Sequence, residues 1–348
     1  MQAFSPGDDM TFEDRHIRLA HGNGGRYMRE LIEQVFRAHL ADPALDVTCD
    51  AAPIALADGT PFVTTDGFTV QPLEFPGGDI GSLAVNGTVN DLAVSGARPL
   101  YLTLSAIIEE GLEAALLERI AASIGRAAKI AGVRVVAGDT KVVPRGHGGG
   151  VYLPTTGIGV RRLGLELGLD RVRVGDALLV SGPLGDHGTA VMLAREDFDL
   201  TGDVRSDCAS VRPLADALID IPGVRFMRDP TRGGLAAVTH ELAQASGLDV
   251  RLDETRLPVR DAVRSVCEIL GYDPYYLACE GRVVAVVAGE AAEAALAAWQ
   301  ALDDGRDAAI VGMLAPGGAR GGRVILATSA GGERSLEELE DDPLPRIC

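Results

Sequence analysis

The sequence predicts a compact two-domain protein that mixes helices with sheets, of the α/β or α+β class. Its 348 residues are too many for one typical hydrophobic core. A hydrophobic fraction of 47% together with 43 glycines is typical of a folded chain with many tight turns. A boundary falls near residues 160–175, where RRLGLELGLDRVRVGD follows the strand pattern TTGIGV and leads into a new unit.

The charge and the cysteines narrow the class of function. A net charge of −18 without any basic stripe excludes a nucleic-acid-binding protein, whereas acidic clusters could hold divalent cations. The cysteines show no CxxC and no regular spacing, which favours reduced thiols over a disulfide framework or a zinc site. They are Cys49, Cys208, Cys267, Cys279 and Cys348. The polar N-terminus and the absence of a long apolar run predict a cytoplasmic protein without a membrane segment.

The first candidate binding element is the glycine-rich turn HGNGG at residues 21–25, which leads into an amphipathic helix. Backbone N–H groups at the start of a helix can approach a phosphate, and glycines leave room for it. An ordinary flexible loop is the alternative reading of this turn. The chain has no GxxxxGK[ST] sequence, so an ordinary P-loop is absent.

Four aspartates of the first half each follow or interrupt an apolar stretch. They are Asp50, Asp66, Asp91 and Asp139. The segments before Asp66 and Asp139 have the pattern of buried strands, while Asp91 lies in a helical pattern. A single aspartate at such a place usually forms a turn or caps a helix. Four of them beside small residues favour a magnesium–polyphosphate site, at which Lys141 could contact a transferring phosphoryl group.

The second half carries two shorter signals. In DPTRGG, Asp229 belongs to a turn, and the two glycines open a helix and could let a phosphate or metal approach the backbone. A structural turn is the alternative. In LACEGRVVAVV, Glu280 stands at the mouth of a buried strand, where a lone carboxylate more often caps a turn than acts as a base.

The last eighteen residues, GGERSLEELEDDPLPRIC, predict a strap with little apolar surface to bury. Pro343 and Pro345 favour extended backbone and limit the entropy lost if the strap enters a cleft. Cys348 is then a nucleophile on a tether. A frayed end whose cysteine is incidental is the alternative.

The motifs HGNGG, FPGGDIG, NDLAVSGA, GDTKVV, DPTRGG, ACEG and PRIC occur in an order that resembles one superfamily. It includes aminoimidazole ribonucleotide synthetase, selenophosphate synthetase and thiamine-phosphate kinase, and within it the resemblance is strongest to the HypE family of hydrogenase maturation proteins. The resemblance implies a two-domain, PurM-like α+β fold with a flexible C-terminal tail. It implies an ATP-binding and dimerisation domain at residues 1–165, a second α+β domain at 166–330 and a mobile tail at 331–348.

The resemblance also implies roles for individual residues. The magnesium ligands carried over by motif are Asp50, Asp66, Asp91, Asp139 and Asp229. The nucleotide contacts are Gly22, Asn23, Gly24, Asp66, Asn90, Asp91, Asp139, Thr140, Lys141 and Asp229. The catalytic residues are Cys348, Glu280 and Lys141. Asp50 departs from the family pattern, because the chain has CDAA where relatives often carry two adjacent acids.

The implied reaction uses ATP and Mg²⁺ to dehydrate a carbamoyl group on the sulfur of Cys348 to a thiocyanate. The implied partners are HypF, which supplies the carbamoyl group, and the HypC–HypD complex, which receives the cyanide ligand for the iron of [NiFe]-hydrogenase. A homodimer is expected as well. The alternatives are a related small-molecule kinase, a selenophosphate synthetase, or a nucleotide-binding scaffold without catalysis. No cysteine precedes Cys49, which argues against the synthetase.

Overall fold

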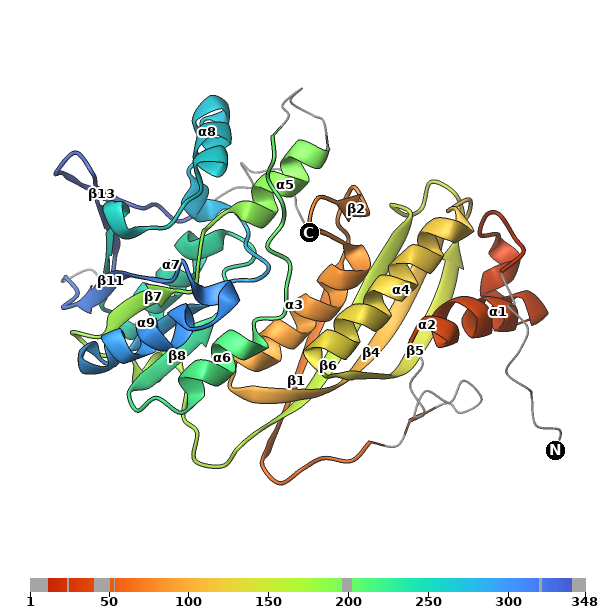
Figure 1. The fold of residues 1–348 in the computed structure, drawn as a ribbon, viewed down its shortest axis with the longest axis horizontal. Coiled ribbons are helices and arrows are strands. Elements are labelled where there is room, and N and C mark those ends of the chain that lie inside the picture. The colour runs from red at the N-terminus through yellow and green to blue at the C-terminus, as the bar shows by residue number, and fades with distance from the viewer. Residues whose placement is uncertain are drawn as a thin grey trace.

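The computed structural model describes residues 12–23, 25–40, 51–52, 54–195, 202–318 and 321–339. They form two units, each built on its own large sheet, that lie side by side along the longest axis of the molecule (Figure 1). Helices pack on the sheet in both units. The predicted α+β class is therefore confirmed.

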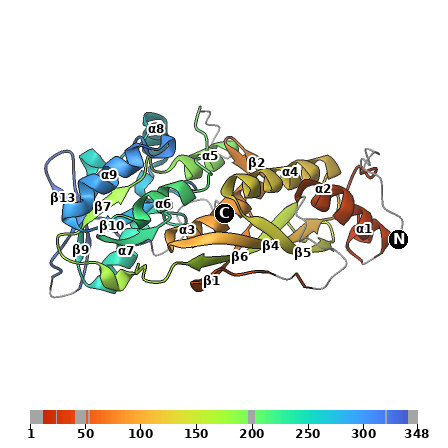
Figure 2. The same ribbon diagram turned by 60° about the horizontal axis from the view of Figure 1, so that its bottom comes forward.

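The sheet of the first unit has the strand order β1–β6–β4–β5. Its strands are β1 (Thr60–Phe68), β4 (Ala97–Glu109), β5 (Arg134–Val143) and β6 (Val151–Arg161). Helices α3 (Ile80–Val94) and α4 (Ala114–Ala131) lie together on one face of this sheet (Figure 2). Because side chains alternate along a strand, Thr64 and Asp66 of β1 face α3, whereas Val63 and Thr65 face away from it.

Helix α3 lies at the centre of the molecule and contacts both units. The carboxylate of Asp79 caps its first turn by accepting hydrogen bonds from the N–H groups of Gly81 and Ser82, at 2.7 and 3.0 Å. Nearly every side chain of α3 is buried, because α4, the sheet and the second unit surround it. Polar groups on α3 therefore face protein on all sides and need partners there.

Short elements complete the first unit. They are η1 (Leu19–Gly22), α1 (Arg26–Leu31), η2 (Ile32–Arg37), α2 (Ala38–Leu40), β2 (Glu74–Phe75) and β3 (Gly78–Asp79). The segment from α1 to α2 is helical throughout and packs Leu31, Val35 and Phe36 into the core beside α4. The helix predicted after the glycine-rich turn is therefore confirmed.

The sheet of the second unit has seven strands in the order β13–β12–β9–β11–β7–β10–β8. They are β7 (Ala177–Val180), β8 (Val224–Arg228), β9 (Asp249–Asp253), β10 (Val284–Val287), β11 (Ala309–Ala315), β12 (Val324–Ala327) and β13 (Glu333–Ser335). The helices are α5 (Asp186–Ala194), α6 (Arg212–Ile219), α7 (Gly234–Ser246), α8 (Asp261–Leu270) and α9 (Ala292–Gln300), with short turns η3 (Leu169–Arg171), η4 (Glu254–Arg256), η5 (Pro274–Tyr276), η6 (Gly289–Ala291) and η7 (Asp303–Gly305). One core cluster joins α7 to the sheet and another joins α6 and α9 to it, so the sheet is covered on both faces.

The second unit extends past residue 330, the position at which the sequence predicted the tail to begin. Strand β13 pairs with β12, and Leu336 is fully buried in the core on the α7 side. The carbonyl of Leu336 accepts a hydrogen bond from His240 Nε2 at 2.7 Å, and Tyr276 donates to the carbonyl of Glu337 at 2.6 Å. One well-placed leucine thus anchors the first part of a strap whose composition is otherwise polar.

Candidate active site

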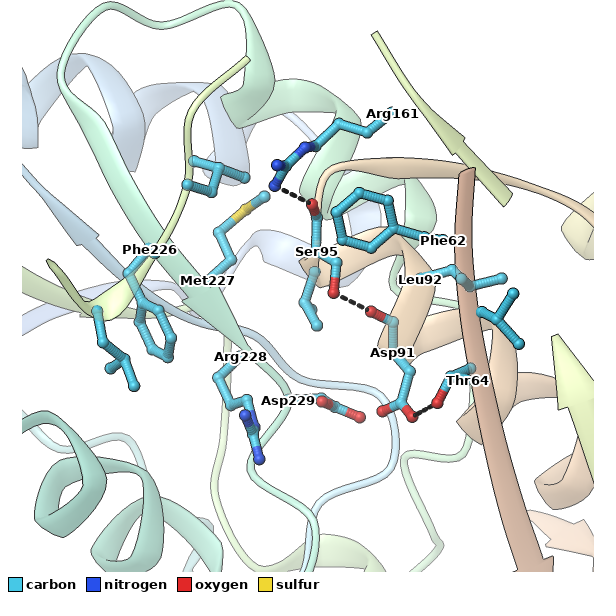
Figure 3. A pocket seen from close by; sticks show the side chains of 15 residues that line it. Phe62, Thr64, Asp91, Leu92, Ser95, Arg161, Phe226, Met227, Arg228 and Asp229 are labelled. Atoms are coloured by element: carbon cyan, nitrogen blue, oxygen red, sulfur yellow. Dashed lines mark hydrogen bonds between the residues drawn. The ribbon is translucent and has the colours of Figure 1, made fainter. Parts of the chain in front are cut away.

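Two adjoining cavities lie where the units meet. The larger, of about 430 Å³, is lined by β1, the end of α3 and β8 (Figure 3). Phe62 and Met227 contribute apolar walls, and Asp91 and Asp229 point toward each other at its polar end. The smaller, of about 70 Å³, also contains Asp91 and Asp229 and adds Asp66, Arg232 and Glu280. The combined space has one apolar end and one acidic end.

The acidic end collects four carboxyl groups from four separate elements. Asp66 comes from β1, Asp91 from α3, Asp229 follows β8, and Glu280 precedes β10. Thr64 fixes the orientation of Asp91 by donating a hydrogen bond to its Oδ2 at 2.6 Å. The sequence predicted Asp66, Asp91, Asp229 and Glu280 from separate motifs, and the structure brings all of them to one cavity.

Crowding and burial raise the pKa of three of these carboxyl groups, those of Asp66, Asp229 and Glu280. Burial, followed by the charge of Asp91, raises the pKa of Asp66 to about 6 and that of Asp229 to about 7. Burial raises the pKa of Glu280 well above its ordinary value, and the charges of Asp229 and Asp207 raise it further. Carboxyl groups held in this way favour a cation beside them, and a buried Glu280 can act as a proton acceptor once a cation and substrate are bound.

The donor chemistry fits Mg²⁺ bound together with a polyphosphate. Magnesium takes oxygen ligands and is commonly held by one or two carboxylates plus substrate phosphates. Asp66, Asp91 and Asp229 offer such oxygens from both units at one end of the cavity. Within the described ranges, no three acidic, histidine or cysteine side chains already surround one metal position. These residues therefore fit a Mg²⁺ ion whose remaining ligands come from the phosphate oxygens of the substrate.

Arg232 is a residue of this cavity that the sequence interpretation missed. It belongs to DPTRGG, lies just before α7, lines the smaller cavity and acts to lower the pKa of Asp66 by its charge. The signal was present in the sequence, since Arg232 is the one cation in that motif. A guanidinium beside carboxylates is suited to contact phosphate oxygens.

The structure places a second group of predicted residues elsewhere. Asp139 and Lys141 lie on β5, the edge strand farthest from β1, and form an exposed ion pair at 3.5 Å. Three strand spacings of about 4.8 Å separate β5 from β1, so these side chains do not reach the acidic cluster of their own chain. Thr140 faces the opposite way and is buried. Gly22 packs against Val142 of β5, where an added Cβ would approach its backbone nitrogen to 2.7 Å.

Asn90 is buried and makes its contacts within the protein. Its Nδ2 donates to the carbonyls of Glu280 at 3.1 Å and Ala209 at 3.0 Å, and its Oδ1 accepts from the N–H of Val211 at 2.8 Å. Its predicted nucleotide contact stays a prediction. Asn23 is exposed beside the Gly22 turn. Three other predicted residues, Gly24, Asp50 and Cys348, lie outside the described residues.

The chain matches known protein families over most of its length. Residues 49–161 match the family described as AIR synthase related protein, N-terminal domain, and residues 173–325 match its C-terminal domain. The fold and the acidic cavity between the two units therefore define a member of the AIR synthase related class, with the PurM-like fold that the sequence predicted.

More similar proteins narrow the class. The carbamoyl dehydratase HypE of Rhodobacter capsulatus is 49% identical over 342 residues, which cover 97% of this chain and 100% of that protein. A crystal structure of the maturation protein HypE in complex with ATP has a TM-score of 0.90 and 44% identity, covering 95% of this chain and 99% of that one. A HypE–HypF complex structure has a TM-score of 0.77 and 42% identity, covering 89% and 99%. The chain belongs to the HypE family of carbamoyl dehydratases.

Family membership does not favour the small-molecule kinase, the selenophosphate synthetase or the non-catalytic scaffold that the sequence left as alternatives. In the described part of the chain, every helix is too short or too polar to cross a bilayer.

Proposed function

We propose that this protein uses ATP to dehydrate a carbamoyl group on the sulfur of Cys348 to a thiocyanate, the source of the cyanide ligand of [NiFe]-hydrogenase. The observation that carries this assignment is the buried Glu280 beside Asp66, Asp91 and Asp229 in one cavity between the two units. Membership of the HypE family and the ATP complex of a relative support it. The cytoplasm, where thiols stay reduced, is the expected compartment.

The cavity suggests how ATP is divided between its two ends. The apolar walls that include Phe62 and Met227 suit the base and sugar, and the acidic end suits the phosphates with Mg²⁺. When bound, Mg²⁺ neutralises charge on the transferring phosphoryl group. Asp66, Asp91 and Asp229 would hold that ion, and Arg232 would contact the phosphate oxygens.

The chemistry is a phosphoryl transfer followed by an elimination. The carbamoyl oxygen attacks the γ-phosphorus, and ADP leaves. The nitrogen gives one of its two protons to water as the O-phosphorylated imidate forms. The C–O bond then breaks, the oxygen departs with phosphate, and the second N–H proton passes to a base. Glu280 suits that base, because its buried carboxylate has a high proton affinity and adjoins the smaller cavity. The product is a thiocyanate carried by the same sulfur.

The partners follow from the two transfers that the sulfur must undergo. HypF is proposed as the carbamoyl donor, and the solved complex of a relative with HypF supports this. The HypC–HypD complex is proposed to accept the cyanide. Thiolate is a good leaving group for that step.

Mass spectrometry tests the function directly. The protein is incubated with HypF, carbamoyl phosphate and ATP, and the mass of the peptide containing Cys348 is followed over time. We expect the peptide to gain one carbamoyl group and then to lose one water when the bound ATP is consumed. A carbamoyl group that persists while ATP turns over would contradict the proposed dehydration.

Glu280→Gln should slow the dehydration and leave nucleotide binding in place. Glutamine has the size of glutamate but cannot accept the proton, and general-base help is commonly worth about 10²–10⁴ in rate. The carbamoylated form should therefore accumulate in single-turnover mass spectrometry, while calorimetry gives ATP affinity close to that of the wild type. Loss of ATP binding with a normal dehydration rate per bound ATP would instead make Glu280 a nucleotide or metal contact.

The uncovered face of the first sheet supports the proposed homodimer. Val63 is 68% exposed on this face, and its cross-strand partner Ile158 on β6 is half-buried. Ile107 lies farther along the same face, on β4, and is half-buried too. Gly67 is on the same face and lines the smaller cavity, with no atom within 4 Å of the place a Cβ would take. The acidic cavity therefore borders this face. A second copy docked here would bring another β5, with its Asp139 and Lys141, to the same face.

Ile158→Arg should disrupt this dimer, because it places a charge within the apolar face. Light scattering should give a dimer for the wild type and a monomer for the variant. Ile130→Arg is the matched control, since Ile130 is 82% exposed on α4, on the other side of the sheet. A dimeric Ile158→Arg protein would place the interface elsewhere.

A further inference from the structure

The turn that carries Glu280 is held by a buried carboxylate from a distant part of the chain. Asp207 accepts the N–H of Glu280 on Oδ1 at 3.0 Å and the N–H of Gly281 on Oδ2 at 3.2 Å. The side chain of Asp207 is only 1% exposed. Both oxygens are therefore used on the backbone of the turn from which the proposed base projects.

The carbonyl group of Glu280 is hydrogen-bonded as well. The carbonyl of Glu280 accepts Asn90 Nδ2 at 3.1 Å and the N–H of Ala209 at 3.4 Å. Residues 207–211 thus lie between α3 and the Glu280 turn, with Asn90 joining all three. Backbone groups on both sides of Glu280 have fixed partners, which limits the movement of its carboxylate relative to the aspartates.

The charge of Asp207 is balanced inside the protein. Arg282 Nε lies 3.5 Å from Asp207 Oδ2, and the same guanidinium donates to the carbonyls of Pro183 at 3.2 Å and Asp304 at 3.1 Å. A buried ion pair of this kind adds little net stability compared with apolar residues of similar size. Its presence beside the reactive turn therefore points to a role other than stability.

The turn is also shaped to receive this segment. A Cβ on Gly281 would lie 1.9 Å from the carbonyl oxygen of Asp207, so the segment 207–211 can approach only because residue 281 is glycine. A Cβ on Gly182 would lie 2.9 Å from the Arg282 guanidinium, so residue 182 leaves room for the balancing charge. Two glycines thus permit the carboxylate and its partner to reach the turn.

We propose that Asp207 is a positioning residue that holds the Glu280 carboxylate at the reacting nitrogen through the backbone N–H groups of Glu280 and Gly281. This inference rests on the proposed function, in which Glu280 removes the proton. A misplacement of about 1 Å at a reacting group can cost on the order of 10²-fold in rate. Loss of the Asp207 carboxylate should therefore slow dehydration without removing any group that contacts ATP.

The test is Asp207→Asn, which keeps the size of the side chain but replaces one acceptor oxygen with a donor. The dehydration rate per bound ATP should fall about 10²-fold, while carbamoylation and ATP affinity stay at wild-type values. Asp249→Asn is the matched control. Asp249 is also buried, accepts the N–H of Arg323 at 3.0 Å and pairs with its guanidinium at 3.4 Å, but it lies at the start of β9 away from the cavity. Both variants are expected to lower Tm, because each removes a buried acceptor, but Asp249→Asn should leave dehydration unchanged.

A double variant separates positioning from general damage to the fold. If Asp207 acts through Glu280, Asp207→Asn should slow the Glu280→Gln protein no further, because the base is already absent. Multiplied losses in the double variant, or a normal dehydration rate in Asp207→Asn, overturn the inference. Where Asp207→Asn does not fold, Asp207→Ser takes its place, and a folded serine variant with normal dehydration overturns the inference too.

The outcomes also distinguish this inference from the proposed function. A slow Glu280→Gln variant with a normal Asp207→Asn variant leaves the function standing and removes only the positioning role. A normal rate in Glu280→Gln removes both, because the group that Asp207 is inferred to place would then have no part in the reaction.

Discussion

Asp91→Asn and Asp229→Asn are each expected to abolish ATP turnover while the protein stays folded. These two carboxylates line both cavities and come from different units, so each would hold the proposed Mg²⁺ from its own unit. Asparagine keeps the shape but removes the charge that a hard cation requires. Calorimetry with Mg-ATP and a phosphate-release assay measure the loss. Normal Mg-ATP binding and hydrolysis in both variants would contradict the site.

Asp229→Asn should lose ATP turnover but gain thermal stability at alkaline pH. The folded-state pKa of Asp229 is raised from 3.8 to about 7, so the folded protein holds this proton more tightly than the unfolded chain does. The free energy of unfolding therefore falls as the pH rises from about 4 through 7, because the folded protein must give up a proton that it binds tightly. In EDTA at pH 8, Asp229→Asn should melt at a higher temperature than the wild type. Asp303→Asn, at a side chain that is 88% exposed, is the control and should change neither activity nor melting.

The acidic cluster shows what sequence patterns predict well. Asp66, Asp91, Asp229 and Glu280 each follow from a local motif in which the acid stands beside glycines or other small residues, which leave room for a ligand. Their convergence follows from family resemblance and not from local pattern. No periodicity in the sequence states that β1 and β8 face each other across α3.

The β5 residues show the limit most clearly. The sequence marks Asp139 and Lys141 as neighbours on a strand, and they do lie on one face of β5. The strand order β1–β6–β4–β5 is not the order of the chain, so their distance from Asp66 could not be predicted from local pattern. Their predicted contact with the nucleotide stays a prediction, which the proposed dimer would explain.

Asp207 illustrates a second limit. Its partners Glu280 and Gly281 are 73 and 74 positions away in the sequence. Nothing in the local sequence SDCAS shows that this carboxylate binds a distant turn and does not cap a turn of its own segment. Such a role depends on long-range packing, as does the anchoring of the strap by Leu336. Local pattern identifies the groups that can react, whereas the residues that position them appear only in the folded chain.

The thiols of the described cysteines are poorly suited to accept a carbamoyl group. Burial raises the pKa of Cys208 to about 12 and that of Cys267 to about 11. Burial also raises the pKa of Cys279 well above its ordinary value. Because the thiolate is the nucleophile, these sulfurs stay protonated and unreactive near neutral pH. The reactive thiol is therefore expected among the two other cysteines, Cys49 and Cys348, and the family resemblance selects Cys348.

Cys348→Ala is expected to abolish carbamoylation while the protein remains folded and binds ATP. Without the sulfur, HypF has no acceptor, and the dehydration has no substrate. Cys348→Ser should fail as well, since a hydroxyl is far less ionised near neutral pH and a poorer leaving group for the transfer to iron. Intact-mass spectrometry after incubation with HypF and carbamoyl phosphate measures the loss.

Cys49→Ala and Cys208→Ala are the matched controls and should accept the carbamoyl group at the wild-type level. Full carbamoylation and dehydration in Cys348→Ala, or their loss in Cys49→Ala alone, would move the acceptor to another sulfur.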